Sequence, residues 1–192
     1  MTSSVKLPSP ATRADIDALP PSMKGEVIDG VLYAMTRPRA RHQSVIAAIT
    51  AHLWTPYDRG RGGPGGWWIL PEPGIELPRA PEVSPDIAGW RRERLPTLPR
   101  DSAITVVPDW VCEILSPRTR RYNLTVKRPF YAEVGVAWMW LVDLDAMVLT
   151  VHRNADGAWV DAGTFADDTE ARAAPFSDAS IDVREWWSDS SP

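Results

Sequence analysis

This chain of 192 residues lacks several features that would assign it to a protein class. Its one cysteine, Cys112, excludes an intramolecular disulfide and a cysteine-based metal site such as structural zinc, and apolar neighbours predict a packing role for it. No apolar run approaches the roughly 20 residues that span a bilayer. The first ten residues are polar and contain prolines, unlike a secretory signal. We therefore expect a cytoplasmic protein.

A general surplus of positive charge is also missing. The formal net charge is -4 and the pI is near 5.4, which argues against a protein that coats nucleic acids non-specifically. Basic residues nevertheless cluster at 37–41, 91–94 and 118–121, and Lys127 and Arg128 follow the last cluster. Such clusters are either solvated loops or local contacts for phosphates.

The composition, with 44% hydrophobic and 24% charged residues, is that of a soluble globular protein. We expect a flexible leader over residues 1–11, a single domain over 12–187 and a tail over 188–192. The glycine-rich stretch 60–66 lacks the Gly-Lys-Ser/Thr ending of a phosphate-binding loop, so we assign it no chemistry.

Hydrophobic periodicity and turn residues predict an α+β fold, in which a mixed β-sheet is flanked by two main helices and carries additional β-hairpins. Helices are expected over 12–19, 41–54 and 124–134, although Pro129 would bend the last helix or mark its start. An Asp-Gly pair predicts a hairpin over 25–35. Further strands are expected at 67–70, 74–77, 87–90, 110–115, 138–143, 147–152 and 158–165.

One carboxylate stands out because it lies in an apolar strand. Side chains alternate along a strand, so Val111, Glu113 and Leu115 share one face while Trp110, Cys112 and Ile114 share the other. Both faces are mostly apolar, which is typical of a central strand covered on both sides. An ionised glutamate there is costly unless a cation, a metal or hydrogen bonds compensate it. Glu113 therefore requires a partner.

Asp86 and Lys127 are the residues that we group with Glu113. Two carboxylates near the ends of adjacent strands can bind a proton or a hard dication. Mg²⁺ prefers oxygen ligands, with Mn²⁺ as a second candidate, and such an ion activates water and stabilises charge on phosphorus. A lysine nearby would orient the water or offset phosphate charge. These residue types fit metal-dependent phosphodiester hydrolysis.

The order of several motifs resembles the restriction endonuclease family of the Uma-two type, within the PD-(D/E)xK nuclease superfamily. The motifs are Gly25-Glu26-Val27-Ile28-Asp29-Gly30, His42, Pro85-Asp86, Asp109-Trp110-Val111-Cys112-Glu113-Ile114-Leu115-Ser116-Pro117, Lys127, Tyr131 and Trp140-Leu141-Val142-Asp143. The resemblance covers residues 20 to 165. It implies a mixed sheet flanked by helices, and Mg-dependent cleavage of DNA.

Residue by residue, the resemblance implies that Asp86 and Glu113 bind the metal, that Lys127 is catalytic and that Glu26 completes the site. The parent superfamily places its lysine two residues after the second acid, where this chain has Leu115, so the following helix would supply it. The family often has aspartate where this chain has Asn123. The sequence alone leaves the roles of His42, Asn123 and Tyr131 open.

Structural alternatives exist for each of these residues. Glu113 could form a buried ion pair with Lys127, Asp86 could cap a turn, Lys127 could face solvent, Glu26 could be an exposed strand residue, and His42 could be a core histidine. The chain as a whole could be an inactive nuclease-fold protein that binds nucleic acid or acts in an oligomer. Strand edges and many tryptophans favour a homodimer.

Overall fold

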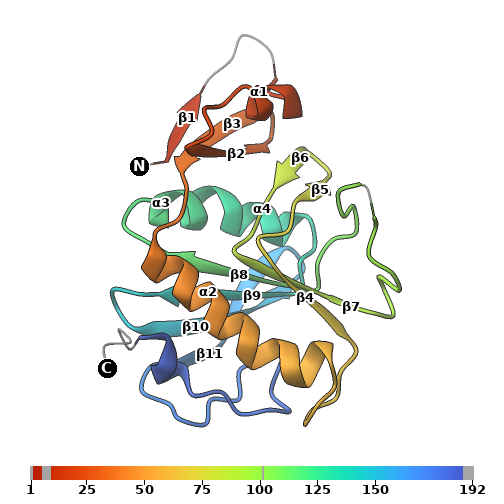
Figure 1. The fold of residues 1–192 in the computed structure, drawn as a ribbon, viewed down its shortest axis with the longest axis vertical. Helices are drawn as coiled ribbons and strands as arrows, with labels where there is room; N and C mark the ends of the chain where they lie inside the picture. The colour runs from red at the N-terminus through yellow and green to blue at the C-terminus, as the bar shows by residue number, and fades with distance from the viewer. Residues whose placement is uncertain (1, 6–9, 101, 188–192) are drawn as a thin grey trace.

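The computed structural model describes residues 2–5, 10–100 and 102–187, which form two β-sheets and several helices (Figure 1). The larger sheet contains β4 (Trp67–Pro71), β7 (Ile87–Arg91), β8 (Trp110–Leu115), β9 (Trp138–Asp143), β10 (Val148–Ala155) and β11 (Ala158–Phe165). The smaller sheet contains β1 (Ser3–Val5), β2 (Met23–Ile28), β3 (Val31–Thr36), β5 (Ile75–Leu77) and β6 (Ala80–Val83). The spatial orders are β11-β10-β9-β8-β7-β4 and β1-β3-β2-β6-β5. The fold is therefore α+β, as predicted.

The helical elements are α1 (Arg13–Asp17), α2 (Ala40–Leu53), α3 (Arg120–Tyr122) and α4 (Arg128–Glu133), with π-helical turns η1 (Trp54–Asp58) and η2 (Asn123–Lys127) and a 3₁₀ turn η3 (Val183–Trp186). Of the helices among the described residues, none is long and apolar enough to cross a membrane. The elements α3, η2 and α4 follow one another directly and form the crossover between the parallel strands β8 and β9.

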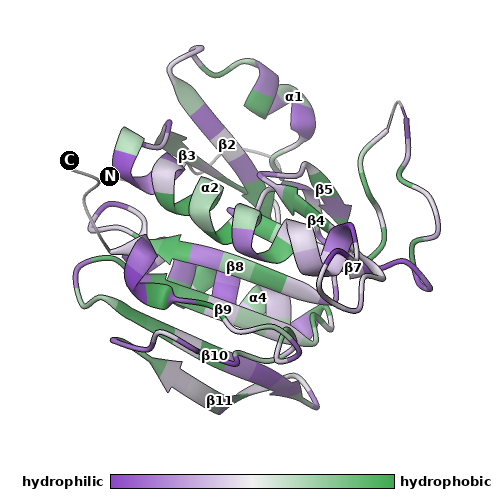
Figure 2. Ribbon diagram, turned by 60° about the horizontal axis from the view of Figure 1, so that its bottom comes forward, coloured by the Kyte–Doolittle hydropathy of each residue, from purple (hydrophilic) through white to green (hydrophobic). Residues whose placement is uncertain are grey.

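The central strand β8 pairs antiparallel with β7 and parallel with β9, so the larger sheet is mixed. All six residues of β8 are buried. Trp110, Cys112 and Ile114 pack in the core that includes the apolar stripe of α2, which lies against this part of the sheet in Figure 2. Val111 and Leu115 pack in a second core with residues of α4. The predicted strand, covered on both faces, is confirmed.

The crossover helix accommodates Pro129 without a break in its path. The proline lies in the first turn of α4, directly after the π-helical turn η2, and the first turn is where a helix tolerates proline. The π-helical turn η2 precedes α4 and ends at Lys127. Single π-helical turns are common at functional sites. Here the turn places Lys127 on the buried side of the crossover.

The hairpin β2–β3 turns at Asp29 and Gly30, whose φ angles of 52° and 73° suit the two central positions of a type I′ turn. Its prediction from the Asp-Gly pair is confirmed. The strand β6 was not predicted. It contains Pro81, a residue that disfavours a strand when only the sequence is read.

The structure describes part of the segment 1–11 that the sequence analysis predicts as a flexible leader. Ser3–Val5 form β1, which pairs antiparallel with β3, and Ala11 is buried against the hairpin β2–β3. The edge of β3 offers unpaired backbone groups to β1, and no local sequence signal marks that contact. The predicted tail at 188–192 lies outside the described residues.

Phe176 closes the core on the α2 side of the larger sheet. Its ring centroid lies 4.7 Å from Tyr57, 4.8 Å from Trp67, 4.9 Å from Trp110 and 5.6 Å from Trp140. Edge and tilted geometries of this kind add to the gain from apolar burial. The C-terminal segment is therefore an integral part of the core.

Replacing Phe176 by alanine removes a fully buried ring from four aromatic neighbours. We expect Phe176→Ala to lower the free energy of unfolding by about 3–5 kcal/mol, measured by urea titration. Val160→Ala is the control, because Val160 is 47% exposed and its loss should change stability by less than about 0.5 kcal/mol. Equal effects of the two substitutions would contradict this account of the core.

Candidate active site

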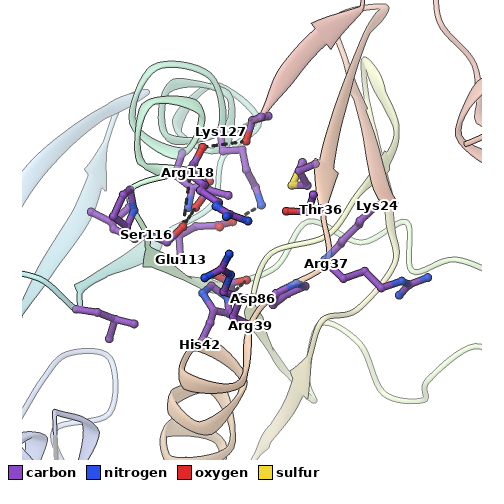
Figure 3. A pocket seen from close by; sticks show the side chains of 18 of the residues that line it. Lys24, Thr36, Arg37, Arg39, His42, Asp86, Glu113, Ser116, Arg118 and Lys127 are labelled. Carbon is purple, nitrogen blue, oxygen red and sulfur yellow. Dashed lines mark hydrogen bonds and ion pairs between the residues drawn. The ribbon is translucent and has the colours of Figure 1, made fainter. Parts of the chain in front are cut away.

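A cavity of about 300 Å³ lies where the smaller sheet, the C-terminal end of β8 and the first turn of α2 meet (Figure 3). Its lining includes Glu26, Asp86, Glu113 and Lys127, the four residues that the sequence singled out. They come from β2, the residue before β7, β8 and η2 respectively. The fold thus brings residues from four separate segments to one cavity.

Asp86 and Glu113 are neighbours across two antiparallel strands. Ile87 pairs with Cys112, so the same register places Asp86 opposite Glu113 on one face of the sheet. Asp86 Oδ2 accepts a hydrogen bond of 2.7 Å from the backbone N–H of Ile114, which fixes its carboxylate at the end of β8. This contact joins two strands, so a turn-capping role for Asp86 is wrong.

Lys127 is 3% exposed and is not the solvent-facing lysine of the structural alternative. Its Nζ lies 2.6 Å from Glu113 Oε1 and 3.3 Å from Glu26 Oε1, and it donates to the carbonyl oxygen of Ser84 at 3.1 Å. The buried ion pair considered for Glu113 is therefore present. A buried pair contributes little net stability, so it does not by itself assign a structural role.

Glu26 is 1% exposed, so its interpretation as an exposed strand residue is wrong. Besides Lys127, it accepts hydrogen bonds from the backbone N–H of Ser84 and from the hydroxyl of Tyr122. A second hydroxyl, that of Tyr131, donates to Glu113 Oε1 at 3.0 Å. Each buried glutamate is thus held by one tyrosine.

His42 lies in the first turn of α2, and its Nε2 is 2.9 Å from Asp86 Oδ1. It therefore belongs to the site and not only to the buried stripe of its helix. Burial lowers the pKa of His42, but the hydrogen bond and the charge of Asp86 outweigh burial and raise it. Burial raises the pKa of Asp86, yet His42, Lys127 and the Ile114 N–H together bring it below its ordinary value.

Burial and nearby charges also shift the pKa values of Glu113 and Lys127. Burial raises the pKa of Glu113 to about 8, with Lys127 opposing the shift and the charges of Asp86 and Glu26 adding to it. Burial disfavours the charged form of Lys127, but the nearby carboxylates of Glu113, Glu26 and Asp86 raise its pKa. The site therefore keeps a lysine cation beside a glutamate that takes up a proton easily.

A family model described as "Putative restriction endonuclease", Uma2, matches residues 13–184. The chain belongs to the Uma2 family. A solved structure from Anabaena variabilis ATCC 29413, described as a putative nuclease belonging to DUF820, matches with a TM-score of 0.70 and 19% identity. That match covers 93% of this chain and 98% of the other, and at this identity it shows a shared fold. No curated protein matches the sequence.

Within this Uma2 member, sequence reasoning missed Ser84 and Tyr122. Both contact Glu26, which is 58 residues from Ser84 and 96 residues from Tyr122 in the sequence. No local pattern marks either residue, apart from the position of Ser84 two residues before Asp86. Asn123, which stands where the Uma-two resemblance leads us to expect aspartate, is buried and lines the cavity. Its side chain adds no negative charge there.

The fit of a metal ion to this site depends on how many carboxylate oxygen atoms can reach one position. Among the described residues, no three His, Cys, Asp or Glu side chains are arranged around a common metal position. Mg²⁺, however, is usually held by one or two carboxylates together with waters and substrate phosphates. Asp86 and Glu113 meet that requirement, and a cation, the ammonium of Lys127, already lies against Glu113. The donor set therefore fits a hard dication.

The raised pKa of Glu113 predicts a specific pH dependence of stability. A carboxyl with a higher pKa in the folded state binds more protons than it does unfolded, so stability falls as pH rises from about 5 to 8. Relative to wild type, Glu113→Gln should therefore gain stability over this range, by at most about 1.4 kcal/mol per pH unit. Urea titrations at pH 5, 6, 7 and 8 measure the difference.

The exposed Glu93 supplies the control, since Glu93→Gln should show a constant difference from wild type over the same range. A constant difference between wild type and Glu113→Gln from pH 5 to 8 would instead mean that Glu113 is ionised throughout and that the ion pair with Lys127 dominates.

Proposed function

We propose that this chain is a metal-dependent endonuclease that hydrolyses DNA phosphodiester bonds with Mg²⁺, or with Mn²⁺ in its place. One observation carries the proposal: Asp86 and Glu113 are neighbours across β7 and β8, and Lys127 joins them in one cavity. The Uma2 family description supports a nuclease, and the relative from Anabaena variabilis carries a nuclease description as well.

Each residue has a role that follows from its contacts. Asp86 and Glu113 would hold the metal, which when bound supplies an activated water and stabilises negative charge on the phosphate. His42 orients the Asp86 carboxylate, and Tyr131 orients that of Glu113. Lys127 provides positive charge where the pentavalent phosphorus would accumulate negative charge.

Two arginines at the cavity suit the phosphates on either side of the scissile bond. Arg39 lies at the start of α2 and Arg118 in the loop after β8, and both line the cavity (Figure 3). Within the described ranges, neither guanidinium forms an ion pair with a carboxylate. A guanidinium presents a planar fork of donors that matches a phosphate. A locally basic entrance on an acidic protein is what a polyanionic substrate requires.

Loss of either carboxylate should abolish cleavage while the protein remains folded. We expect Asp86→Asn and Glu113→Gln to lower the rate of supercoiled-plasmid nicking in Mg²⁺ by more than about 100-fold, since even partners of metal ligands account for about 10–100-fold. Gel analysis of nicking measures the rate, and circular dichroism checks the fold. Asp156→Asn in an exposed turn is the matched control and should keep full activity.

Persistent cleavage by both carboxylate variants, independent of added metal, would remove the metal-dependent mechanism. If the wild type binds DNA without cutting it under any metal condition, the chain is a binding protein on a nuclease fold. One observation favours a binding protein: all three N–H donors of Lys127 already have acceptors, so none is left for a phosphate.

Arg39→Ala and Arg118→Ala should each weaken DNA binding because each removes one phosphate contact. We expect the slope of log K against log salt concentration to fall in magnitude by about 1 for each substitution. Fluorescence anisotropy with a labelled oligonucleotide in Ca²⁺ measures it. Arg153→Ala, on an exposed position of β10, is the matched control. An unchanged slope for all three variants would place the phosphates elsewhere.

A further inference from the structure

The ammonium of Lys127 is buried, and each of its N–H donors has an oxygen partner. A lysine has three N–H donors and no acceptor. Here three oxygen atoms receive them: Glu113 Oε1 at 2.6 Å, Ser84 O at 3.1 Å and Glu26 Oε1 at 3.3 Å. The rings of Tyr122 and Tyr131 lie 5.9 and 5.8 Å from Nζ. In this state no donor remains for a water molecule or a phosphate.

The two glutamates around Lys127 differ in how many of their carboxylate oxygen atoms have a partner. Both oxygens of Glu26 are engaged, Oε1 by Lys127 and the Ser84 N–H, and Oε2 by the Tyr122 hydroxyl. Glu113 is engaged through Oε1 alone, by Lys127 and Tyr131. Within the described part of the chain, no hydrogen bond involves Glu113 Oε2. Glu113 therefore has one oxygen atom without a protein partner toward a metal, whereas both oxygen atoms of Glu26 are engaged.

The position of Asp86 adds to this asymmetry. It stands opposite Glu113 in the β7–β8 register and lines the same cavity. Ser84, which holds both Glu26 and Lys127, lies only two residues before Asp86. The segment 84–86 thus contains both Ser84, whose carbonyl accepts a hydrogen bond from Lys127, and Asp86, one of the two acids proposed to bind the metal. A change at Asp86 and Glu113 need not disturb the contacts of Lys127 with Glu26 and Ser84.

We propose that Lys127 is the resting occupant of the cation position, and that it leaves Glu113 when a divalent ion is bound by Asp86 and Glu113. Glu26 and the Ser84 carbonyl are the groups that keep the ammonium in the cavity in the metal-bound state. Glu26 is then a positioning residue and not a metal ligand. This inference rests on the proposed function, because it concerns the metal of that same site.

Two consequences follow from competition between the two cations. The wild-type protein binds divalent metal weakly, because the ion must replace a lysine that the carboxylates already stabilise. Metal binding also releases one N–H of Lys127, the one that faced Glu113. That donor becomes available to a phosphate or a water only when the metal is present, so the lysine acts only in the loaded site.

The experiment measures Mn²⁺ affinity by isothermal titration calorimetry on the full chain, without DNA. Lys127→Met removes the competing charge and should bind Mn²⁺ at least about tenfold more tightly than wild type. Glu26→Gln should stay within about threefold of wild type while losing plasmid nicking, because only the position of Lys127 is affected. Asp86→Asn should lose most of the affinity.

Lys127→Met leaves buried carboxylates without a counter-charge, so its stability is also measured. The melting temperature of this variant should rise more on addition of Mn²⁺ than that of wild type does. The double variant Glu26→Gln/Lys127→Met carries one buried acid fewer and should fold more readily. It should bind Mn²⁺ as tightly as Lys127→Met does, since Glu26 contributes no ligand.

The outcomes separate this inference from the proposed function. If Lys127→Met and the double variant bind Mn²⁺ no more tightly than wild type, Lys127 does not compete with the metal. If Glu26→Gln loses metal binding, Glu26 is a ligand; either result overturns the inference even where wild type still nicks DNA in Mg²⁺. Tighter binding by Lys127→Met together with no cleavage of any DNA by wild type supports the inference and contradicts the proposed function.

Discussion

The ammonium of Lys127, buried between Glu113 and Glu26, is the interaction on which the site depends. Three buried carboxylates, those of Glu26, Asp86 and Glu113, line one cavity. Without a cation their mutual repulsion and their desolvation would both oppose folding. Breaking a buried pair by removing one partner typically costs 3–5 kcal/mol, which is a large part of a domain's stability. A cation at this position offsets both effects.

The architecture supplies it through the crossover that parallel strands require. β8 and β9 run parallel, so the chain must return across the face of the sheet, and α3, η2 and α4 make that return. The covered face is the one that Glu113 shares with Val111 and Leu115. A residue on the inner side of the crossover consequently meets Glu113, and η2 places Lys127 there. The hairpin β2–β3 adds Glu26 from the other side.

The parts that the sequence predicted are those with a local signal. Alternation identified β8 as a central strand, an Asp-Gly pair identified the hairpin, and a charge in an apolar strand identified Glu113 as a residue in need of a cation. The parts that it missed depend on distant contacts. The hydroxyl of Tyr122 contacts Glu26, which is 96 residues away in the sequence, and β1 pairs with the edge of β3.

The pairing of Asp86 with Glu113 was predicted only in part from the sequence. The sequence placed each acid near a strand end, but their convergence follows from the antiparallel register of β7 and β8. A shift of one residue would move one of the two carboxylates to the opposite face of the sheet. The register is fixed by the burial of Ile87 and Cys112 in the core that packs against α2. The hydrophobic core therefore determines the geometry of the charged site.

The packing of the core also explains why β8 has a leucine and not a lysine at position 115. Position 115 lies two residues after Glu113 and on its face, so a lysine there would extend along the strand beside the carboxylate. Leu115 instead is buried in the core under the crossover, and it also lines the cavity. A charge at that position would lose this apolar contact. Lys127 reaches Glu113 from the crossover that covers this face, so the ammonium meets the carboxylate while Leu115 keeps its apolar contacts.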